Sequence, residues 1–434
     1  MKEKLRCFFE GKKVLILGFG REGRSTLELI KDFDCNIGIA DQNLTVTPEL
    51  EQYELFSGEN YLDAINEYEI VMKTPGIALF DKLSDRDKSK ITGQTDLLLR
   101  FCENKIIGVT GTKGKSTTSS LIHHMLEKCG KNSVLIGNIG IPPLTITDSI
   151  ENDTIIVCEM SCHQLEYVQA SPDIAVLLNI YEEHLDHYVD FSAYKHAKEN
   201  IYRFQSSNDA LIYNTECHNE ELDAISSKKI SASQKEKADI CIDGQNIVLY
   251  DETIPYEKIA PKLAGTHNLY NIAVALGAAK ECGCDLGSAV EAVSSFNGLE
   301  HRMELVRIVN GVKYINDSIS TIPLATINAA KAFLADTVII GGMDRGINYD
   351  ILVEYLNTGA VKNIICLPDS GYRIADMLDT ASNIFRVSDM EEAVSKADEV
   401  TKKCCVLSPA AASYGFYKNF EERGRHFKEL VNKL

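Results

Sequence analysis

The segment Ile106–Thr118, IIGVTGTKGKSTT, decides the fold of the central part of this chain. A short apolar run leads into a glycine-rich turn that is followed by Lys115, Ser116 and Thr117. Glycines let a backbone turn approach phosphates, a lysine neutralises the terminal phosphates, and a serine can hold Mg²⁺. The segment therefore predicts a triphosphate-binding strand, turn and helix. Val109 stands where the strict P-loop pattern has glycine, so a plain strand–turn–helix connection remains the alternative.

Three such strand-plus-glycine starts divide the chain, and each is followed by alternating apolar runs and amphipathic segments. This alternation predicts an α/β fold with parallel sheets, and the length of 434 residues suggests about three domains. The first start, Lys13–Gly23, has the glycine spacing of a dinucleotide-binding turn at Gly18, Gly20 and Gly23, and Asp41 closes the next apolar run. We expect domains at residues 1–102, 103–302 and 303–434. The expected strands include Asn36–Ala40, Thr154–Cys158, Ile174–Leu178, Val312–Ile315 and Thr337–Ile340, and the expected helices include Ser116–Cys129, Asn268–Cys282 and Glu421–Leu434.

Composition excludes several classes of protein. With 44% hydrophobic and 25% charged residues, the chain has the composition of an ordinary globular protein. The net charge of −18 argues against a nucleic-acid partner, although a local pocket can still hold a small anion. The thirteen cysteines lack zinc-type spacing, which favours reduced thiols, and no apolar stretch is long enough for export or membrane insertion. We therefore expect a cytoplasmic protein.

Polar residues cluster after two of the expected central strands. Glu159 follows the first of these strands, where a carboxylate would lie beside a bound nucleotide as a magnesium ligand or water-positioning group. His184, Asp186 and His187 follow the second strand, and Lys198 lies on the next expected helix. Spacing alone leaves these residues undecided between a site and a solvated surface. Other candidates for nucleotide contact or for a capping loop are His267, Asn268, Asn271, His301, Arg302, Ser408, Ser413 and Lys418.

Nine motifs, in order along nearly the whole chain, resemble those of the Mur ligase family. They are GVTGTKGKST, GNIG at Gly137–Gly140, EMSCHQLE, LNIYEEHLDHY, AGTHNLYN, GLEHRME, NDS at Asn316–Ser318, GGMDRG and LSPAAASYGFYKNFEERG. The family's phosphate loop does not require glycine at position 109, although Lys113 stands where asparagine is more usual. The resemblance implies an N-terminal Rossmann-like domain for a uridine nucleotide, a central ATPase with a parallel sheet, and a C-terminal Rossmann-like domain. The first glycine turn would then serve UDP and not NAD.

The resemblance also implies a reaction. It is that of an ATP-dependent amide ligase, which joins D-glutamate to UDP-N-acetylmuramoyl-L-alanine through an acyl phosphate in peptidoglycan precursor synthesis. Such a ligase would use ATP and two Mg²⁺ ions, carry Lys198 as a carbamate, and act as a monomer without nucleic acid or membrane insertion.

The family's functional positions map onto four groups of residues in this sequence. The catalytic and metal-binding group is Lys115, Ser116, Glu159, His184 and Lys198. The ATP-binding group is Gly111, Thr112, Lys113, Gly114, Lys115, Ser116, Thr117, Asn271, Arg302 and Asp317. The UDP-substrate group is Gly20, Asp41, Thr74, Gly76 and Asn138, and the glutamate group is Thr321, Arg345, Ser413 and Phe420.

One loop departs from the family pattern. Where the family commonly reads NDSKATN, this chain has Ile319 in place of the lysine, and Pro323 follows shortly after. The change in charge and backbone leaves open a ligase of the same type that adds L-glutamate. Three further alternatives are folylpolyglutamate synthase, an NAD-dependent oxidoreductase based on the first glycine turn, and a noncatalytic nucleotide-binding switch.

Overall fold

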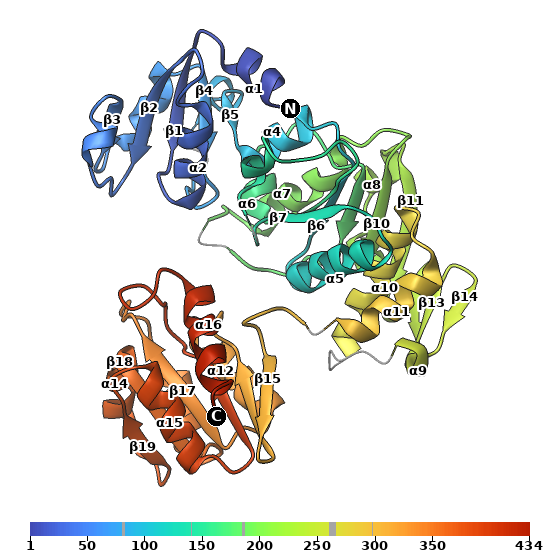
Figure 1. Ribbon diagram of the computed structural model, residues 1–434. Coiled ribbons are helices and arrows are strands. Elements are labelled where there is room, and N and C mark those ends of the chain that lie inside the picture. The colour runs from blue at the N-terminus through green and yellow to red at the C-terminus, as the bar shows by residue number, and fades with distance from the viewer. Residues whose placement is uncertain (80–82, 140, 185–186, 260–265, 297) are drawn as a thin grey trace. The chain divides into compact units, whose positions relative to one another are not determined.

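The computed structural model describes residues 1–434 except 80–82, 140, 185–186, 260–265 and 297. The chain forms two compact units, Met1–Phe296 and Asn297–Leu434. Within the described residues, the first unit contains two sheets and the second contains one (Figure 1). All three sheets are mainly parallel and carry helices, so the predicted α/β class is confirmed.

The first sheet is parallel, with the strand order β3-β2-β1-β4-β5. This order is that of the first five strands of a Rossmann fold, in which ligands bind at the carboxyl ends of the strands. The α2 helix packs tightly behind the first turn, because a Cβ at Gly23 would lie 2.1 Å from the carbonyl oxygen of Gly18. The strands are β1 Lys12–Leu17, β2 Cys35–Asp41, β3 Glu54–Ser57, β4 Ile70–Lys73 and β5 Ile91–Thr92, and the helices are α1 Lys2–Phe9, α2 Arg21–Ile30, α3 Asp85–Lys88 and α4 Gln94–Phe101.

The second sheet has the order β14-β13-β12-β11-β10-β9-β6-β8-β7 and is parallel from β7 to β12. Its central strands are buried on both faces, which explains why they read as uninterrupted apolar runs. The strands are β6 Ile106–Thr110, β7 Ser133–Gly137, β8 Ile155–Glu159, β9 Ile174–Leu177, β10 Ala210–Asn214, β11 Lys228–Ser233, β12 Ile240–Asp243, β13 Asn246–Leu249 and β14 Glu252–Ile254. The helices are α5 Lys115–Lys128, α6 Cys162–Leu165, α7 Phe191–Arg203, α8 Glu220–Ala224, α9 Tyr256–Ile259, α10 Thr266–Glu281 and α11 Leu286–Ser295.

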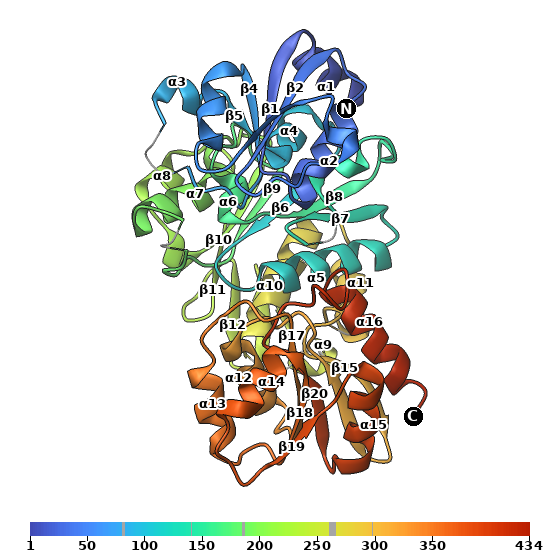
Figure 2. The ribbon, with the colours of Figure 1, turned by 90° about the vertical axis from the view of Figure 1, so that its left-hand side faces the viewer.

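The third sheet has the order β15-β16-β20-β17-β18-β19, and β15 alone runs antiparallel to its neighbour among the described strands. One apolar cluster lies under α12, α13 and α14, and another lies under α15 and α16 on the opposite face (Figure 2). The strands are β15 Glu304–Val309, β16 Val312–Asn316, β17 Thr337–Gly342, β18 Asn363–Asp369, β19 Asn383–Arg386 and β20 Cys404–Leu407. The helices are α12 Pro323–Ala332, α13 Asp350–Asn357, α14 Ser370–Met377, α15 Met390–Val400 and α16 Phe420–Val431.

The expected strands and helices are present, with boundaries that differ by at most three residues. Glu159 is one such difference, because it is the last residue of β8 and does not follow the strand. All thirteen cysteines are free, as expected for reduced thiols. Among the described residues, no helix combines the length and apolar character needed to cross a membrane.

Candidate active site

The phosphate loop lies between β6 and α5, at the carboxyl edge of the second sheet. Gly111 and Gly114 have φ values of +156° and +89°, which residues other than glycine rarely adopt. The loop backbone is clamped by Asn179, which accepts hydrogen bonds from the Thr112 N–H at its carbonyl (2.8 Å) and from the Lys113 N–H at Oδ1 (2.8 Å). The sequence therefore builds a turn that Asn179 holds in place and that requires glycine at both positions.

Asn271 on α10 lies against this loop. A Cβ at Gly114 would lie only 2.6 Å from Asn271 Oδ1, so glycine is what allows the loop and α10 to approach. Asn271 is buried, and its Nδ2 donates to Asn268 Oδ1 at 3.3 Å. The structure thus brings together a loop and a helix that are far apart in the sequence. The nearby His267 belongs to α10, but its side chain lies outside the described residues.

Replacing Gly114 by alanine is expected to raise the KM for ATP about tenfold or more, because the new Cβ both strains the backbone and displaces Asn271. Gly130→Ala is the matched control, since Gly130 also has a positive φ (+74°) but has no atom within 4 Å of its added Cβ. The KM for ATP should stay unchanged in that variant. Equal KM values for the two variants would contradict a role for the Asn271 contact.

Lys115 is folded back onto the loop that it follows. Its Nζ donates to the carbonyl oxygens of Gly111 (2.9 Å) and Thr112 (3.1 Å). Burial lowers the pKa of Lys115, and the nearby Glu159 carboxylate opposes that shift. Ser116 and Thr117 are half-buried in the first turn of α5. The loop therefore presents a cation beside backbone N–H groups, which suits a polyphosphate.

Glu159 at the end of β8 is a fully buried carboxylate with one unused oxygen. Its Oε1 accepts a hydrogen bond from Asn138 Nδ2 at 2.7 Å, whereas Oε2 has no hydrogen-bond partner in the part of the chain that the structure describes. A buried carboxylate oxygen without a partner is costly unless a cation or donor meets it. Oxygen donors of this kind are those that Mg²⁺ prefers, so the residue fits a magnesium site.

Lys198 on α7 reaches the same loop from the other side. Its Nζ donates to the Gly111 carbonyl oxygen at 2.9 Å and lies 4.9 Å from the centre of the Tyr194 ring. The side chain is 1% exposed, and burial lowers its pKa to about 8. Lys115 and Lys198 thus share one carbonyl acceptor, which is an unusual arrangement for two cations. Their convergence marks the loop as a centre for anionic groups.

His184 lies near this centre in a histidine cluster. Its ring centre is 6.1 Å from that of Tyr194, whose hydroxyl is 2.8 Å from Thr112 Oγ1. It is also 4.8 Å from the ring centre of His163, and burial lowers the pKa of His163 to about 4. Asp186 and Gly140, two residues of the sequence motifs, lie outside the described residues.

Four of the five residues assigned to the UDP substrate lie at the carboxyl edge of the first sheet, whereas Asn138 follows β7 in the second sheet. Asp41 Oδ2 accepts a hydrogen bond from the Phe19 N–H at 2.7 Å, so this carboxylate shapes the first glycine turn. Thr74 lies against the same turn, because a Cβ at Gly18 would be 2.0 Å from Thr74 Oγ1. Gly20 directly precedes α2. A Cβ added at Gly20 or at Gly76 would have no neighbouring atom within 4 Å. The structure therefore gathers Gly20, Asp41, Thr74 and Gly76 at one sheet edge, without Asn138.

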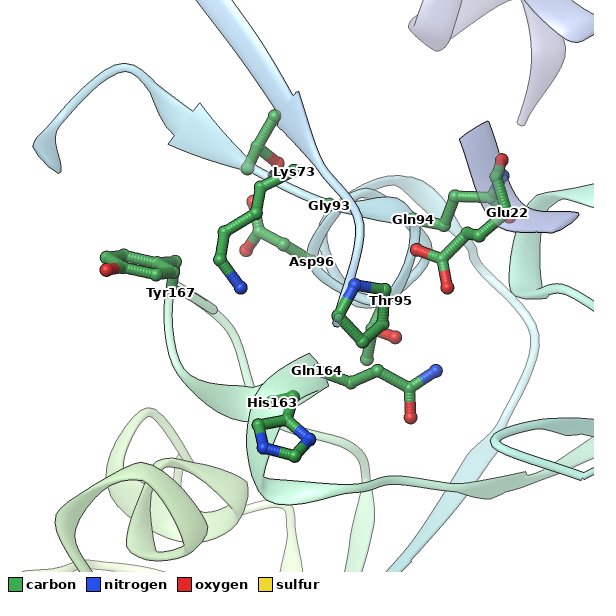
Figure 3. A pocket seen from close by; sticks show the side chains of 11 residues that line it. Glu22, Lys73, Gly93, Gln94, Thr95, Asp96, His163, Gln164 and Tyr167 are labelled. Carbon is green, nitrogen blue, oxygen red and sulfur yellow. Dashed lines mark hydrogen bonds between the residues drawn. The ribbon is translucent and has the colours of Figure 1, made fainter. Parts of the chain in front are cut away.

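A polar pocket between the first sheet and α6 was missed by the sequence analysis. The Glu166 carboxylate accepts from Lys73 Nζ at 3.3 Å and lies 3.1 Å from His187 Nε2. Figure 3 shows Lys73 pointing toward Tyr167, and the lining residues are Glu22, Lys73, Pro75, Thr92, Gly93, Gln94, Thr95, Asp96, His163, Gln164 and Tyr167. Two features of the sequence could have indicated this pocket: Lys73 at the end of an apolar run, and Glu166 at the end of the motif EMSCHQLE.

Glu22→Gln is expected to stabilise the protein increasingly as the pH rises. Burial raises the pKa of Glu22 from 4.5 to about 7, so the folded state binds more protons than the unfolded state between these values, and stability falls with rising pH. Glutamine removes this loss. Melting temperatures from about pH 4 to about pH 8 should therefore diverge from the wild type as the pH rises. A difference that does not change with pH would contradict the argument, and Glu28→Gln on the same helix is the exposed control.

In the second unit, Arg302 and Asp317 lie close together, and the Arg302 charge opposes the rise that burial causes in the pKa of Asp317. Asp317 is buried, and its oxygens accept hydrogen bonds from the Met303 N–H (3.1 Å) and from Ser408 Oγ (2.7 Å). The carboxylate therefore holds two segments of this unit together. The sequence did not indicate this structural role.

The four residues assigned to glutamate lie in loops or at a helix start beyond the carboxyl ends of three neighbouring strands, β16, β20 and β17. Thr321 is half-buried, Ser413 is buried, and the exposed Arg345 guanidinium lies 5.9 Å from the Tyr414 ring centre. Phe420 begins α16. Pro323, which departs from the family pattern, is the first residue of α12, a position where its missing N–H and fixed φ are well tolerated.

Comparison with known proteins places these features in one family. A model of the Mur ligase middle domain matches residues 109–279. A UDP-N-acetylmuramoylalanine–D-glutamate ligase of Clostridium kluyveri is 32% identical over 465 residues, which cover 100% of this chain and 99% of the relative. A ligase of the same name from Clostridium botulinum is 32% identical over 458 residues and covers 99% of both chains.

Solved structures agree with the fold. The UDP-N-acetylmuramate-alanine ligase MurC of Thermotoga maritima has a TM-score of 0.56 at 18% identity and matches 97% of this chain and 99% of its own. The MurF ligase of Thermotoga maritima, in complex with ADP, has a TM-score of 0.53 at 18% identity and matches 99% of this chain and 97% of its own. From its full-length sequence relatives and this fold, the chain belongs to the Mur ligase family.

Proposed function

We propose that this chain is an ATP-dependent, ADP-forming ligase that joins D-glutamate to UDP-N-acetylmuramoyl-L-alanine in peptidoglycan precursor synthesis. The observation that supports this best is the convergence of Lys115, Glu159 and Lys198 on one phosphate loop, in a chain that matches D-glutamate ligases from end to end. Nothing in these relatives favours folylpolyglutamate synthesis or NAD chemistry. We place the enzyme in the cytoplasm, as a monomer that handles small-molecule substrates.

The reaction needs ATP because a free carboxylate is a poor acyl donor. The alanyl carboxylate attacks the γ-phosphorus of ATP, which forms an acyl phosphate and releases ADP. The glutamate amine then attacks the acyl carbon, phosphate leaves, and the nitrogen loses a proton to give the amide. Lys115 would neutralise charge during phosphoryl transfer, and the loop N–H groups would position the phosphates.

Two magnesium sites are part of the proposal. Ser116 and Glu159 would hold one ion, and His184 with a carbamylated Lys198 would hold the other. Bound Mg²⁺ offsets the negative charge of the phosphates and the carboxylate. The free Oε2 of Glu159 supports the first site.

For carbamylation the Lys198 ammonium first loses one proton, and the neutral amine nitrogen then bonds to the carbon of CO₂ and releases a second proton. The two steps together change a cation into an anion. Burial favours the neutral amine that this step requires.

Three sets of residues would bind the substrates. For ATP they are Gly111, Thr112, Lys113, Gly114, Lys115, Ser116, Thr117, Asn271, Arg302 and Asp317. For the UDP substrate they are Gly20, Asp41, Thr74, Gly76 and Asn138, and for glutamate they are Thr321, Arg345, Ser413 and Phe420. An anionic amino acid needs a cation and hydrogen-bond donors, which Arg345 and Ser413 provide.

The test is a ligation assay with ATP, Mg²⁺ and UDP-N-acetylmuramoyl-L-alanine, in which D-glutamate or L-glutamate is added in parallel. Phosphate release and the mass of the product are measured. We expect product with D-glutamate. Product with L-glutamate alone would instead make the segment from Ile319 to Pro323 a specificity signature, and no product with either isomer would reject the substrate assignment.

A further inference from the structure

We propose that Arg423 is a positioning residue that holds the glutamate-binding loops of the second unit in place. This inference rests on the proposed function, because the loops are identified by the residues assigned to glutamate. Arg423 lies in the first turn of α16 and is only 1% exposed. A guanidinium is seldom buried so completely unless fixed partners surround it.

The partners of Arg423 are neutral groups on two loops. Its Nε donates to Ser318 Oγ at 3.0 Å, and its Nη2 donates to the carbonyl oxygens of Ser318 (2.8 Å) and Ala411 (3.1 Å). Ser318 Oγ in turn donates to the Phe420 carbonyl oxygen at 2.8 Å. One planar side chain therefore connects the loop after β16, the loop after β20 and the first turn of α16.

The end of β17 packs against the same guanidinium. A Cβ at Gly342 would lie 3.0 Å from Arg423 Nη1 and 2.5 Å from the Ala412 carbonyl oxygen, so only glycine allows this approach. The Met343 N–H donates to that same carbonyl at 2.9 Å. The loop that continues from Met343 carries Arg345. Arg423 thus lies where all the segments assigned to glutamate meet.

The charge of Arg423 is not matched by a carboxylate. In the described part of the chain it makes no ion pair, and Nη1 has no hydrogen-bond partner. Burial lowers the pKa of Arg423 to about 10, so the group stays protonated at neutral pH. Burying a cation without an opposite charge costs free energy, so the stability of the fold alone does not explain Arg423. The arrangement points to a role in ordering the loops around an anionic substrate.

The first test compares Arg423→Lys and Arg423→Met with Arg425→Met, an exposed control on the same helix. Lysine keeps the charge but loses the planar fork. We expect Arg423→Lys to raise the KM for D-glutamate about tenfold, with the KM values for ATP and the UDP substrate within about twofold of the wild type. Arg423→Met should raise it further. The inference would be overturned if Arg423→Lys folded and kept the wild-type KM for glutamate. It would also be overturned if the KM values for all three substrates rose equally.

A second variant and a second readout keep the test independent of folding and of activity. Ser318→Ala removes the acceptor of Arg423 Nε, so it should also raise the KM for D-glutamate. In the double variant Arg423→Lys/Ser318→Ala, the fold-increase in this KM should be smaller than the product of the two single fold-increases, because both changes break the same contact. Amide hydrogen exchange should become faster in residues 317–321 and 408–413 of Arg423→Lys. Unchanged hydrogen exchange in these residues would overturn the positioning role of Arg423, whether or not the wild type uses D-glutamate. Failure of the wild type to use D-glutamate would instead reject the proposed function.

Discussion

Glu159→Gln is expected to lower the ligation rate about a hundredfold or more while leaving the protein equally or more stable. Glutamine keeps an oxygen for Asn138 Nδ2 but removes the negative charge that would hold magnesium. The buried Oε2 has no hydrogen-bond partner among the described residues, so losing its charge also removes a desolvation cost. Steady-state ligation rates, thermal melting and the magnesium dependence of the rate measure these effects.

The control for Glu159→Gln is Glu281→Gln, at the far end of α10. Glu281 accepts hydrogen bonds from Lys228 and Tyr250, so it resembles Glu159 in charge but takes part in no proposed site. Its replacement should leave the ligation rate unchanged. If Glu159→Gln kept wild-type activity, or if it lost activity only through unfolding, the carboxylate would be structural and the first metal site would be wrong.

Lys198→Ala is expected to lower the ligation rate to a similar extent, because the second magnesium ion would lose an anionic ligand. The wild type should lose activity in buffer freed of CO₂ and regain it when bicarbonate is added, since the neutral amine must react with CO₂. Labelled bicarbonate should give a carbamate signal by nuclear magnetic resonance in the wild type and not in Lys198→Ala.

Lys195→Ala is the matched control for Lys198. It lies three residues earlier on α7, and its more exposed ammonium lies 3.7 Å from Glu199, so its loss should change neither the rate nor the bicarbonate response. Full activity in Lys198→Ala would show that the lysine is needed neither as a cation nor as a carbamate. A large loss of activity without any response to bicarbonate would contradict carbamylation specifically.

Much of the fold was predictable because parallel strands buried on both faces read as short, uninterrupted apolar runs. β6, β9 and β16 begin where the sequence predicts, and α5 begins one residue before its expected start. The antiparallel strands β13 and β14 were not predicted. The Asp243–Gly244 pair between two alternating runs, with Gly244 at φ +62°, was a hairpin signal that could have indicated β12 and β13.

The site was predictable only in part. The glycine pattern indicated the phosphate loop, and the family resemblance assigned Glu159 and Lys198 to the site. Neither carried information on pairs that are distant in sequence, such as Lys73 and Glu166, which are 93 residues apart. Arg423 lies in the polar run EERGRH, which reads as an exposed helix face. Its burial depends on how α16 packs against the ends of three strands, and helical periodicity alone does not show that.

The most direct test of the account follows the oxygen atoms of the alanyl carboxylate. UDP-N-acetylmuramoyl-L-alanine labelled with a heavy oxygen isotope in that carboxylate is ligated to D-glutamate with ATP and Mg²⁺, and the released phosphate is analysed by mass spectrometry. Because the carboxylate would attack ATP and later leave its oxygen on phosphorus, we expect one labelled oxygen in each phosphate released. Ligated product with unlabelled phosphate would contradict the acyl phosphate, and with it the role assigned to the phosphate loop.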